Sequence, residues 1–147
     1  MTIRCLLVAL AILTACAPRE NRLLGEWTCP IDEEDFAGEV GLTFLSSGRL
    51  GIALTLEGPD ERGRRLEATM SGAGSWALVG DLLELDAVDL RLVSAERDGR
   101  NFRHQVAREF EDAMPTLIAS SRVEELTART LVLASGLDPL PELSCVR

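Results

Sequence analysis

The chain has 147 residues, with 24 acidic and 15 basic side chains and a net charge of −9 at pH 7. A charge of this sign opposes binding to nucleic acid and to anionic lipid headgroups, so no nucleic-acid partner is expected. All basic residues are arginine, which excludes Schiff-base chemistry at a lysine. A chain of this length buries roughly two-thirds of its unfolded surface, so we expect one domain that folds without a metal or cofactor.

The N-terminal residues have the order of a secretory signal. Arg4 precedes an apolar run over residues 5–13, and Leu13-Thr14-Ala15-Cys16 follows. The run is shorter than the about 20 residues that a membrane-spanning helix needs. The tetrapeptide resembles the lipobox of bacterial lipoproteins, which implies cleavage before Cys16 and a lipid, such as palmitate, on that cysteine. The alternative is an ordinary cleaved signal.

This resemblance divides the chain into a signal peptide (1–15), a lipidated polar tether (16–22) and a domain (23–147). Ala17, in place of aspartate, resembles the pattern of sorting to the outer membrane. We therefore expect a lipid-anchored protein of the cell envelope that faces the periplasm. Loss of Arg4 with the signal takes the charge from −9 to −10. Membrane contact is thus expected to come mainly from the lipid on Cys16.

Alternating apolar and polar residues predict a series of β-strands. Residues 40–44 and 50–56 form the clearest hairpin, with Ser46-Ser47-Gly48-Arg49 as its turn. Glycines at positions 72 and 74 predict a bulge or bend within one long strand. The remaining strands are predicted over 66–78, 83–85, 88–92, 116–121 and 130–134, separated by turns at 58–64, 79–81 and 122–129.

One stretch has the period of a helix. Apolar residues recur every four positions between 101 and 114, which predicts a helix there, at Phe102, Val106, Phe110 and Met114. Asp98 or Asn101 is the candidate N-cap and Pro115 ends the segment.

The cysteines predict a disulfide in the domain. Cys5 leaves with the signal and Cys16 is assigned to lipid, so Cys29 and Cys145 remain. An even pair in an exported protein is most simply a disulfide. A metal or redox pair is the alternative, and it needs further ligands or a C-x-x-C spacing that the sequence lacks.

Gly25-Glu26-Trp27 opens the first predicted strand and resembles the G-x-W motif of lipocalin-like families. Residues 74–83 and 123–133 are similar to the middle hairpin and last strand of small bacterial lipocalin-like lipoproteins. The resemblance implies a mainly β fold, an antiparallel up-and-down barrel of about eight strands. It also implies that Gly25 and Trp27 close one end, with Arg129 or Arg122 over the indole. A core tryptophan and a surface arginine are the alternative.

A second resemblance is to periplasmic lysozyme inhibitors of the lipoprotein type. Trp27-Thr28-Cys29 and Ser71-Gly72-Ala73-Gly74-Ser75 resemble the cysteine that follows an aromatic residue and the S-G-x-x-Y loop of these inhibitors. Ser75 stands where they have tyrosine. This resemblance implies an inhibitor that acts through its surface.

The leading hypothesis is a binding protein, because a barrel of about eight strands can enclose one small apolar ligand. The candidate lining residues alternate along the predicted strands and are Leu50, Ile52, Leu54, Leu56, Leu66, Met70 and Leu83. If they fill the barrel instead, the protein is a structural or interaction module with an envelope protein partner.

No catalytic or metal-binding pattern stands out, so the chain is not expected to be an enzyme. The motif Gly-x-Ser-x-Gly is absent, and His104, the single histidine, is predicted to be solvated. Asp32-Glu33-Glu34-Asp35 is predicted to be a solvated loop rather than a calcium site, because it lacks the spacing and the glycine of an EF-hand.

Overall fold

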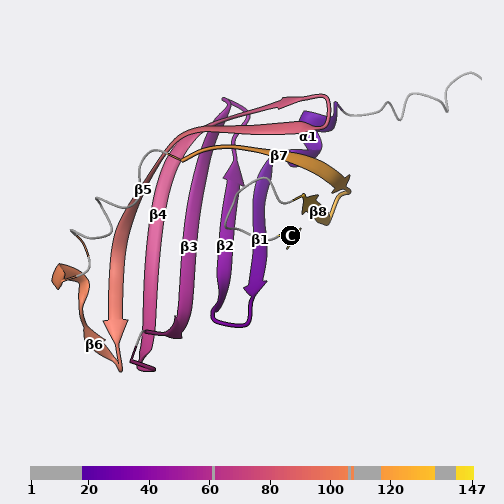
Figure 1. Ribbon diagram of the computed structural model, residues 1–147. Helices are drawn as coiled ribbons and strands as arrows, with labels where there is room; N and C mark the ends of the chain where they lie inside the picture. The colour runs from indigo at the N-terminus through magenta and orange to yellow at the C-terminus, as the bar shows by residue number, and fades with distance from the viewer. Residues whose placement is uncertain (1–17, 61, 106, 108–116, 135–141) are drawn as a thin grey trace, which may run out of the picture.

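A closed antiparallel β-barrel of eight strands forms the domain (Figure 1). The computed structural model describes residues 18–60, 62–105, 107, 117–134 and 142–147. Each barrel strand pairs with the next one along the chain, and the pairing of β1 with β9 closes the ring. The predicted fold class, an up-and-down barrel of about eight strands, is therefore confirmed.

The elements follow one another as α1 (Arg19–Leu23), β1 (Gly25–Asp32), β2 (Ala37–Phe44), β3 (Arg49–Pro59), β4 (Arg65–Val79), β5 (Leu82–Arg97), β6 (Arg100–Asn101), β7 (Leu117–Leu126), β8 (Thr130–Leu133) and β9 (Leu143–Val146). The two-residue β6 pairs with the end of β5 and lies outside the ring.

The predicted hairpin at 40–56 is present as β2 and β3. Val40 pairs with Leu54, Leu42 with Ile52 and Phe44 with Leu50, all with buried side chains. The alternation of the sequence fixes this register, because a slip by one residue would turn all of these side chains outward.

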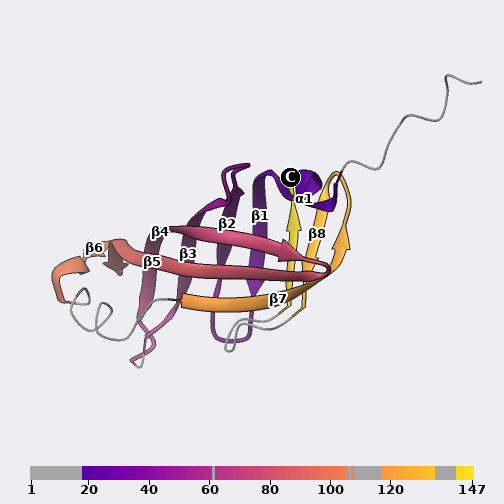
Figure 2. The same ribbon diagram turned by 90° about the horizontal axis from the view of Figure 1, so that it is seen from above.

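β4 is the long bent strand that the sequence predicts. Its pairing with β5 shifts register between Thr69 and Met70 and again between Ala73 and Ser75. Gly72 lies between these two shifts, and a Cβ there would come within 2.7 Å of the Asp89 carbonyl oxygen. Glycine thus allows the two strands to approach closely where β4 bends. In Figure 2, β4, β5 and β7 run side by side across β1–β3.

The prediction of two strands at 83–85 and 88–92 was wrong, because both belong to the single 16-residue strand β5. The buried residues along β5 do not keep one alternation: they have odd numbers at Leu83 and Leu85, an even number at Leu92, and an odd number again at Ala95. Each change accompanies a register shift, between Leu85 and Val88 against β7 and between Thr69 and Met70 against β4. Bulges therefore broke the alternation without ending the strand.

The segment after β6 contains the predicted helix only in part. Residues 103–105 and 107 are helical, Asn101 is in β6, and the Arg103 N–H donates to the Asn101 side chain at 3.0 Å, as expected of the cap. Val106, Phe110, Met114 and Pro115 lie outside the described residues.

Two predictions near the C-terminus were wrong. β7 extends to Leu126, so the turn that was expected at 122–129 spans only 127–129. The final strand β9 was missed. Its buried residues Leu143 and Cys145 alternate with exposed ones, but one of the exposed residues, Val146, is apolar, so the sequence shows no regular alternation of apolar and polar residues there.

Residues 19–22, which the sequence analysis assigned to the tether, belong to α1. Leu23 at its end is fully buried. Arg19 forms an ion pair with Asp81 in the β4–β5 turn and donates to the Val123 carbonyl oxygen. These contacts hold α1 against the barrel.

The antiparallel order gives the barrel two distinct ends. The terminal end consists of α1, the β2–β3, β4–β5 and β7–β8 turns, and Arg147; the opposite end consists of the β1–β2, β3–β4 and β5–β6 turns. Figure 1 shows α1 beside the tip of the β4–β5 hairpin, where Arg19 forms its ion pair with Asp81.

Candidate functional site

The seam between the first and last strands is joined covalently. Within the part of the chain that the structure describes, β1 pairs with β9 only at Thr28 and Val146, and the Cys29–Cys145 disulfide connects the same strands. Both cysteines are fully buried. The predicted disulfide is confirmed, and it reinforces the least extensively paired junction of the barrel.

Trp27 occupies the interior beside this seam, with an exposed fraction of 1%. Its indole N–H donates to the Leu23 carbonyl oxygen at 2.7 Å. The Arg147 guanidinium carbon lies 3.8 Å from the centre of a ring of Trp27, and Nη2 of Arg147 donates to the Arg22 carbonyl oxygen. Trp27, α1 and the end of the chain thus close the terminal end of the barrel.

The arginine over Trp27 was wrongly predicted as Arg129 or Arg122. Arg129 lies in the β7–β8 turn, where its N–H donates to the Thr127 hydroxyl and its carbonyl oxygen accepts from the Arg147 N–H. The predicted Cys29–Cys145 disulfide could have indicated the correct arginine, Arg147. In an antiparallel pair that brings Cys29 opposite Cys145, residue 27 lies opposite residue 147. The observed pairing of Thr28 with Val146 has this register.

The backbone conformation at position 25, also at this end of the barrel, favours glycine. Its φ is +111°, a conformation that residues with a Cβ rarely adopt. The glycine of the G-x-W motif therefore lets the chain turn from α1 into β1, and Trp27 points inward two residues later.

An apolar recess of about 370 Å³ opens at the opposite end of the barrel. Its lining comes from the β1–β2 turn, the end of β3 and the start of β4, and includes Phe36, Leu56, Leu66, Ala68 and Met70. Met70 is only 1% exposed and lies deepest, whereas the other four are partly exposed. Apolar side chains thus remain in contact with solvent inside a concave surface.

The predicted lining residues divide between this recess and the packed core. Leu56, Leu66 and Met70 line the recess. Leu50, Ile52, Leu54 and Leu83 are buried in the hydrophobic core together with Trp27 and Phe44. The barrel is therefore packed toward the terminal end and hollowed at the opposite end.

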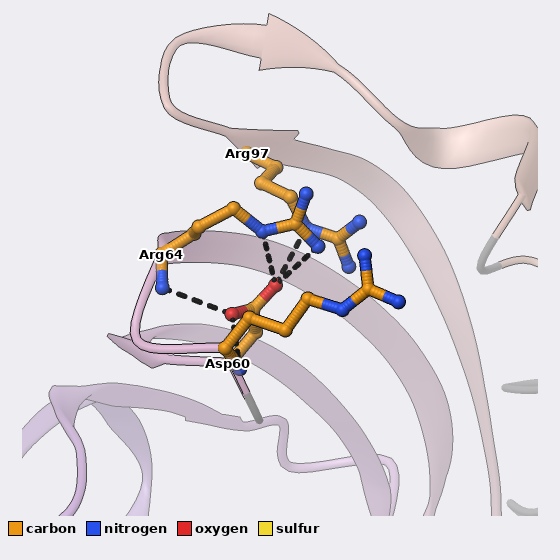
Figure 3. A network of polar contacts seen from close by, with 4 residues as sticks. Asp60, Arg64 and Arg97 are labelled. Atoms are coloured by element: carbon orange, nitrogen blue, oxygen red, sulfur yellow. Dashed lines mark hydrogen bonds and ion pairs between the residues drawn. The ribbon is translucent and has the colours of Figure 1, made fainter.

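Beside the recess, Asp60 connects the β3–β4 turn to the end of β5 (Figure 3). Oδ1 accepts from the backbone N–H groups of Arg62 and Arg64, while Oδ2 accepts from the Arg64 side chain and lies 3.0 Å from Nε of Arg97. The hydrogen bond from the Arg64 backbone, then that from its side chain, lowers the pKa of Asp60 to about 2 despite partial desolvation.

Arg97 extends this network, because its guanidinium also lies 3.8 Å from the ring centre of Phe102. The β3–β4 turn, β5 and the segment after β6 are thereby held together. An aspartate that stays ionised well below neutral pH suits such a structural role better than proton transfer, which needs a pKa near the working pH.

Other charged candidates lie on the surface. His104 and the run Asp32 to Asp35 are exposed, as predicted. The side chains of Glu84, Asp86 and Asp89 are exposed as well. Among the residues that the structure describes, no group of three or more His, Cys, Asp or Glu side chains is placed so that it could hold a metal ion. In the same part of the chain, no helix has the length and apolar character required to cross a membrane.

No family model matches the chain, and no curated protein matches it.

Proposed function

We propose that this protein is a lipoprotein of the cell envelope, anchored through Cys16 and facing the periplasm from the outer membrane, whose barrel binds a small apolar ligand. The anchor rests on the signal-like segment and on Leu13-Thr14-Ala15-Cys16. The binding function rests on the recess at the opposite end.

The observation that carries the binding proposal is the exposure of apolar side chains in this concave site. Its volume of about 370 Å³ lies within the range of small-molecule pockets, roughly 300–1,000 Å³. Phe36, Leu56, Leu66 and Ala68 remain partly exposed there. An apolar ligand would remove their surface from water, which is the main source of affinity in such sites.

The packed terminal half limits the size of this ligand. Trp27, Phe44, Leu50 and Leu83 are at most 2% exposed, so the interior beyond Met70 is occupied by side chains. A ligand therefore rests in the mouth of the barrel rather than passing along its axis.

The same structure weakens the alternative of a lysozyme inhibitor. The segment from Ser71 to Ser75, which resembles the inhibitor loop, lies inside strand β4 and pairs with β3. It therefore does not project as a loop that could enter an active-site cleft.

A bulky residue in the recess tests ligand binding. Ala68→Phe places a ring among the lining residues, whereas Ala53→Phe places the same ring on the exposed outer face of β3. We expect an apolar naphthylamine dye to bind residues 17–147, with affinity reduced at least about tenfold by Ala68→Phe and unchanged by Ala53→Phe. Equal binding by both variants would refute the recess as the site.

Replacement of the candidate lipidation site tests the anchor. Cys16→Ala should release the protein from the membrane fraction and abolish incorporation of labelled palmitate. Persistent labelling, or unchanged membrane association, would show that the anchor is not on this residue.

A further inference from the structure

We propose that the terminal end of the barrel is a membrane-contact surface, which docks end-on onto anionic phospholipid next to the anchor. This inference rests on the proposed lipid at Cys16. It specifies how the domain is oriented, with the recess facing away from the bilayer.

Exposed apolar residues are concentrated at this end. Five large apolar residues are exposed among those described, and four of them are Leu45, Val79, Leu82 and Val146. Val79 and Leu82 flank the turn at the tip of the β4–β5 hairpin, and Leu45 begins the β2–β3 turn. The fifth, Val93, is in the second half of β5.

The two turns form one surface. The Trp76 backbone N–H donates to the Gly48 carbonyl oxygen, and its indole N–H donates to the Leu45 carbonyl oxygen. The β2–β3 turn therefore packs on β4 close to the hairpin tip. Side chains of this kind insert into the boundary between headgroups and acyl chains.

The charge of the turns is distributed unevenly along the barrel axis. Within the described residues, α1, the turns of the terminal end and Arg147 carry four arginines and two acidic residues. The turns of the opposite end carry two arginines and five acidic residues. The net charge of −9 is therefore not spread evenly. The turns of the terminal end are net positive and compatible with anionic lipid, whereas those of the opposite end are net negative and repelled by it.

A hollow suited to a headgroup lies on the terminal end. It has a volume of about 480 Å³ and is lined by Arg22, Leu126, Thr127, Ala128 and Arg147. Guanidinium groups such as those of Arg22 and Arg147 are the side chains that bind phosphate through charged hydrogen bonds.

The position of the anchor leaves little freedom for another orientation. Arg19 is held by Asp81 and the Val123 carbonyl oxygen, and it is three residues from Cys16. Three residues span at most about 10 Å. A lipid on Cys16 would therefore hold α1 and the hairpin tip against the headgroups.

The test uses the full chain, processed in a bacterial host and reconstituted into vesicles of an equal mixture of phosphatidylethanolamine and phosphatidylglycerol. Brominated phospholipid quenches tryptophan that lies near the bilayer, and Trp76 contacts the Leu45 turn. We expect quenching that is reduced by Trp76→Phe, which leaves only the buried Trp27, and reduced by roughly half or more in Val79→Ser/Leu82→Ser, because the apolar tips no longer insert.

Matched variants separate docking from general effects. Val93→Ser removes the exposed apolar residue outside the terminal end and should leave the quenching unchanged. Arg22→Gln should lower the quenching with phosphatidylglycerol but not with phosphatidylcholine alone. The thermal unfolding of each variant confirms that it is folded.

The mass of the purified chain distinguishes the two proposals. A lipid on Cys16 without quenching of Trp76 would overturn end-on docking and leave the anchor intact. A mature chain without lipid would refute the anchor, and the docking inference would fall with it. Equal loss of quenching in Val93→Ser and in Val79→Ser/Leu82→Ser would also overturn the inference of end-on docking.

Discussion

Arg147 is the residue whose contact with Trp27 closes the terminal end. Arg147→Ala removes both the contact with the indole and the hydrogen bond to the Arg22 carbonyl oxygen. We expect a loss of about 0.5–1 kcal/mol in the free energy of unfolding, as for exposed cation–π pairs. Arg129→Ala is the matched control and should cost less than about 0.5 kcal/mol. Chemical denaturation measures both; a larger cost for Arg129→Ala would contradict the assignment.

Asp60 makes the stability of the barrel depend on pH. The hydrogen bonds from Arg64, first from its backbone and then from its side chain, lower the pKa of Asp60 from the ordinary aspartate value of 3.8 to about 2, so the folded state favours the ionised form. The stabilisation is fully present above pH 4 and is lost as the pH falls toward 2.

Asp60→Asn should therefore be less stable than the wild type at neutral pH, and the two should converge near pH 2. Thermal unfolding across this range tests the prediction, with Glu84→Gln on the exposed outer face as control. A constant difference between Asp60→Asn and the wild type down to pH 2 would exclude the carboxylate as the cause.

At the level of elements, the bend of β4 depends on Gly72. Gly72→Ala places a Cβ 2.7 Å from the backbone oxygen of Asp89, which cannot move without disturbing the β4–β5 pairing. We expect a destabilisation of about 1–3 kcal/mol. The control Gly41→Ala meets Ala53 only at 3.6 Å and should be neutral or stabilising by up to about 1 kcal/mol. Similar effects of both substitutions on chemical unfolding would show that the bend tolerates a side chain.

The elements also show what the sequence can predict. Regular alternation located β2, β3 and β4, because one inward face determines both strand and register. The same signal failed at β5, where register shifts move the buried positions from odd to even residue numbers and back, and at β9, where the exposed residue Val146 is apolar. The recess was predicted only as a set of inward positions. Alternation shows that Leu54 and Leu56 face inward, but it does not show which of them is covered by the rest of the barrel.

At the scale of the whole molecule, the disulfide joins strands from the two ends of the domain. It links residues 116 positions apart, so its removal releases a long loop in the unfolded chain. Cys29→Ala/Cys145→Ala should lower the free energy of unfolding by about 2–5 kcal/mol. Denaturation of the oxidised wild type and the double variant gives this difference; equal stabilities would mean that strand pairing alone holds the seam.

The two ends of the barrel have separate roles in this account. The terminal end is filled with side chains, carries α1 and presents exposed apolar residues, while the opposite end carries the recess. A lipid on Cys16 would place the recess toward the periplasm, where a ligand could enter it from solution.

The most direct test of the binding function is the native mass of residues 17–147, exported to the periplasm and purified without detergent. We expect an apolar adduct on the wild type and on Ala53→Phe that is lost on denaturation and is absent from Ala68→Phe. Bare protein in all three samples would contradict a ligand-binding role for the recess and would favour a barrel that acts through its surface.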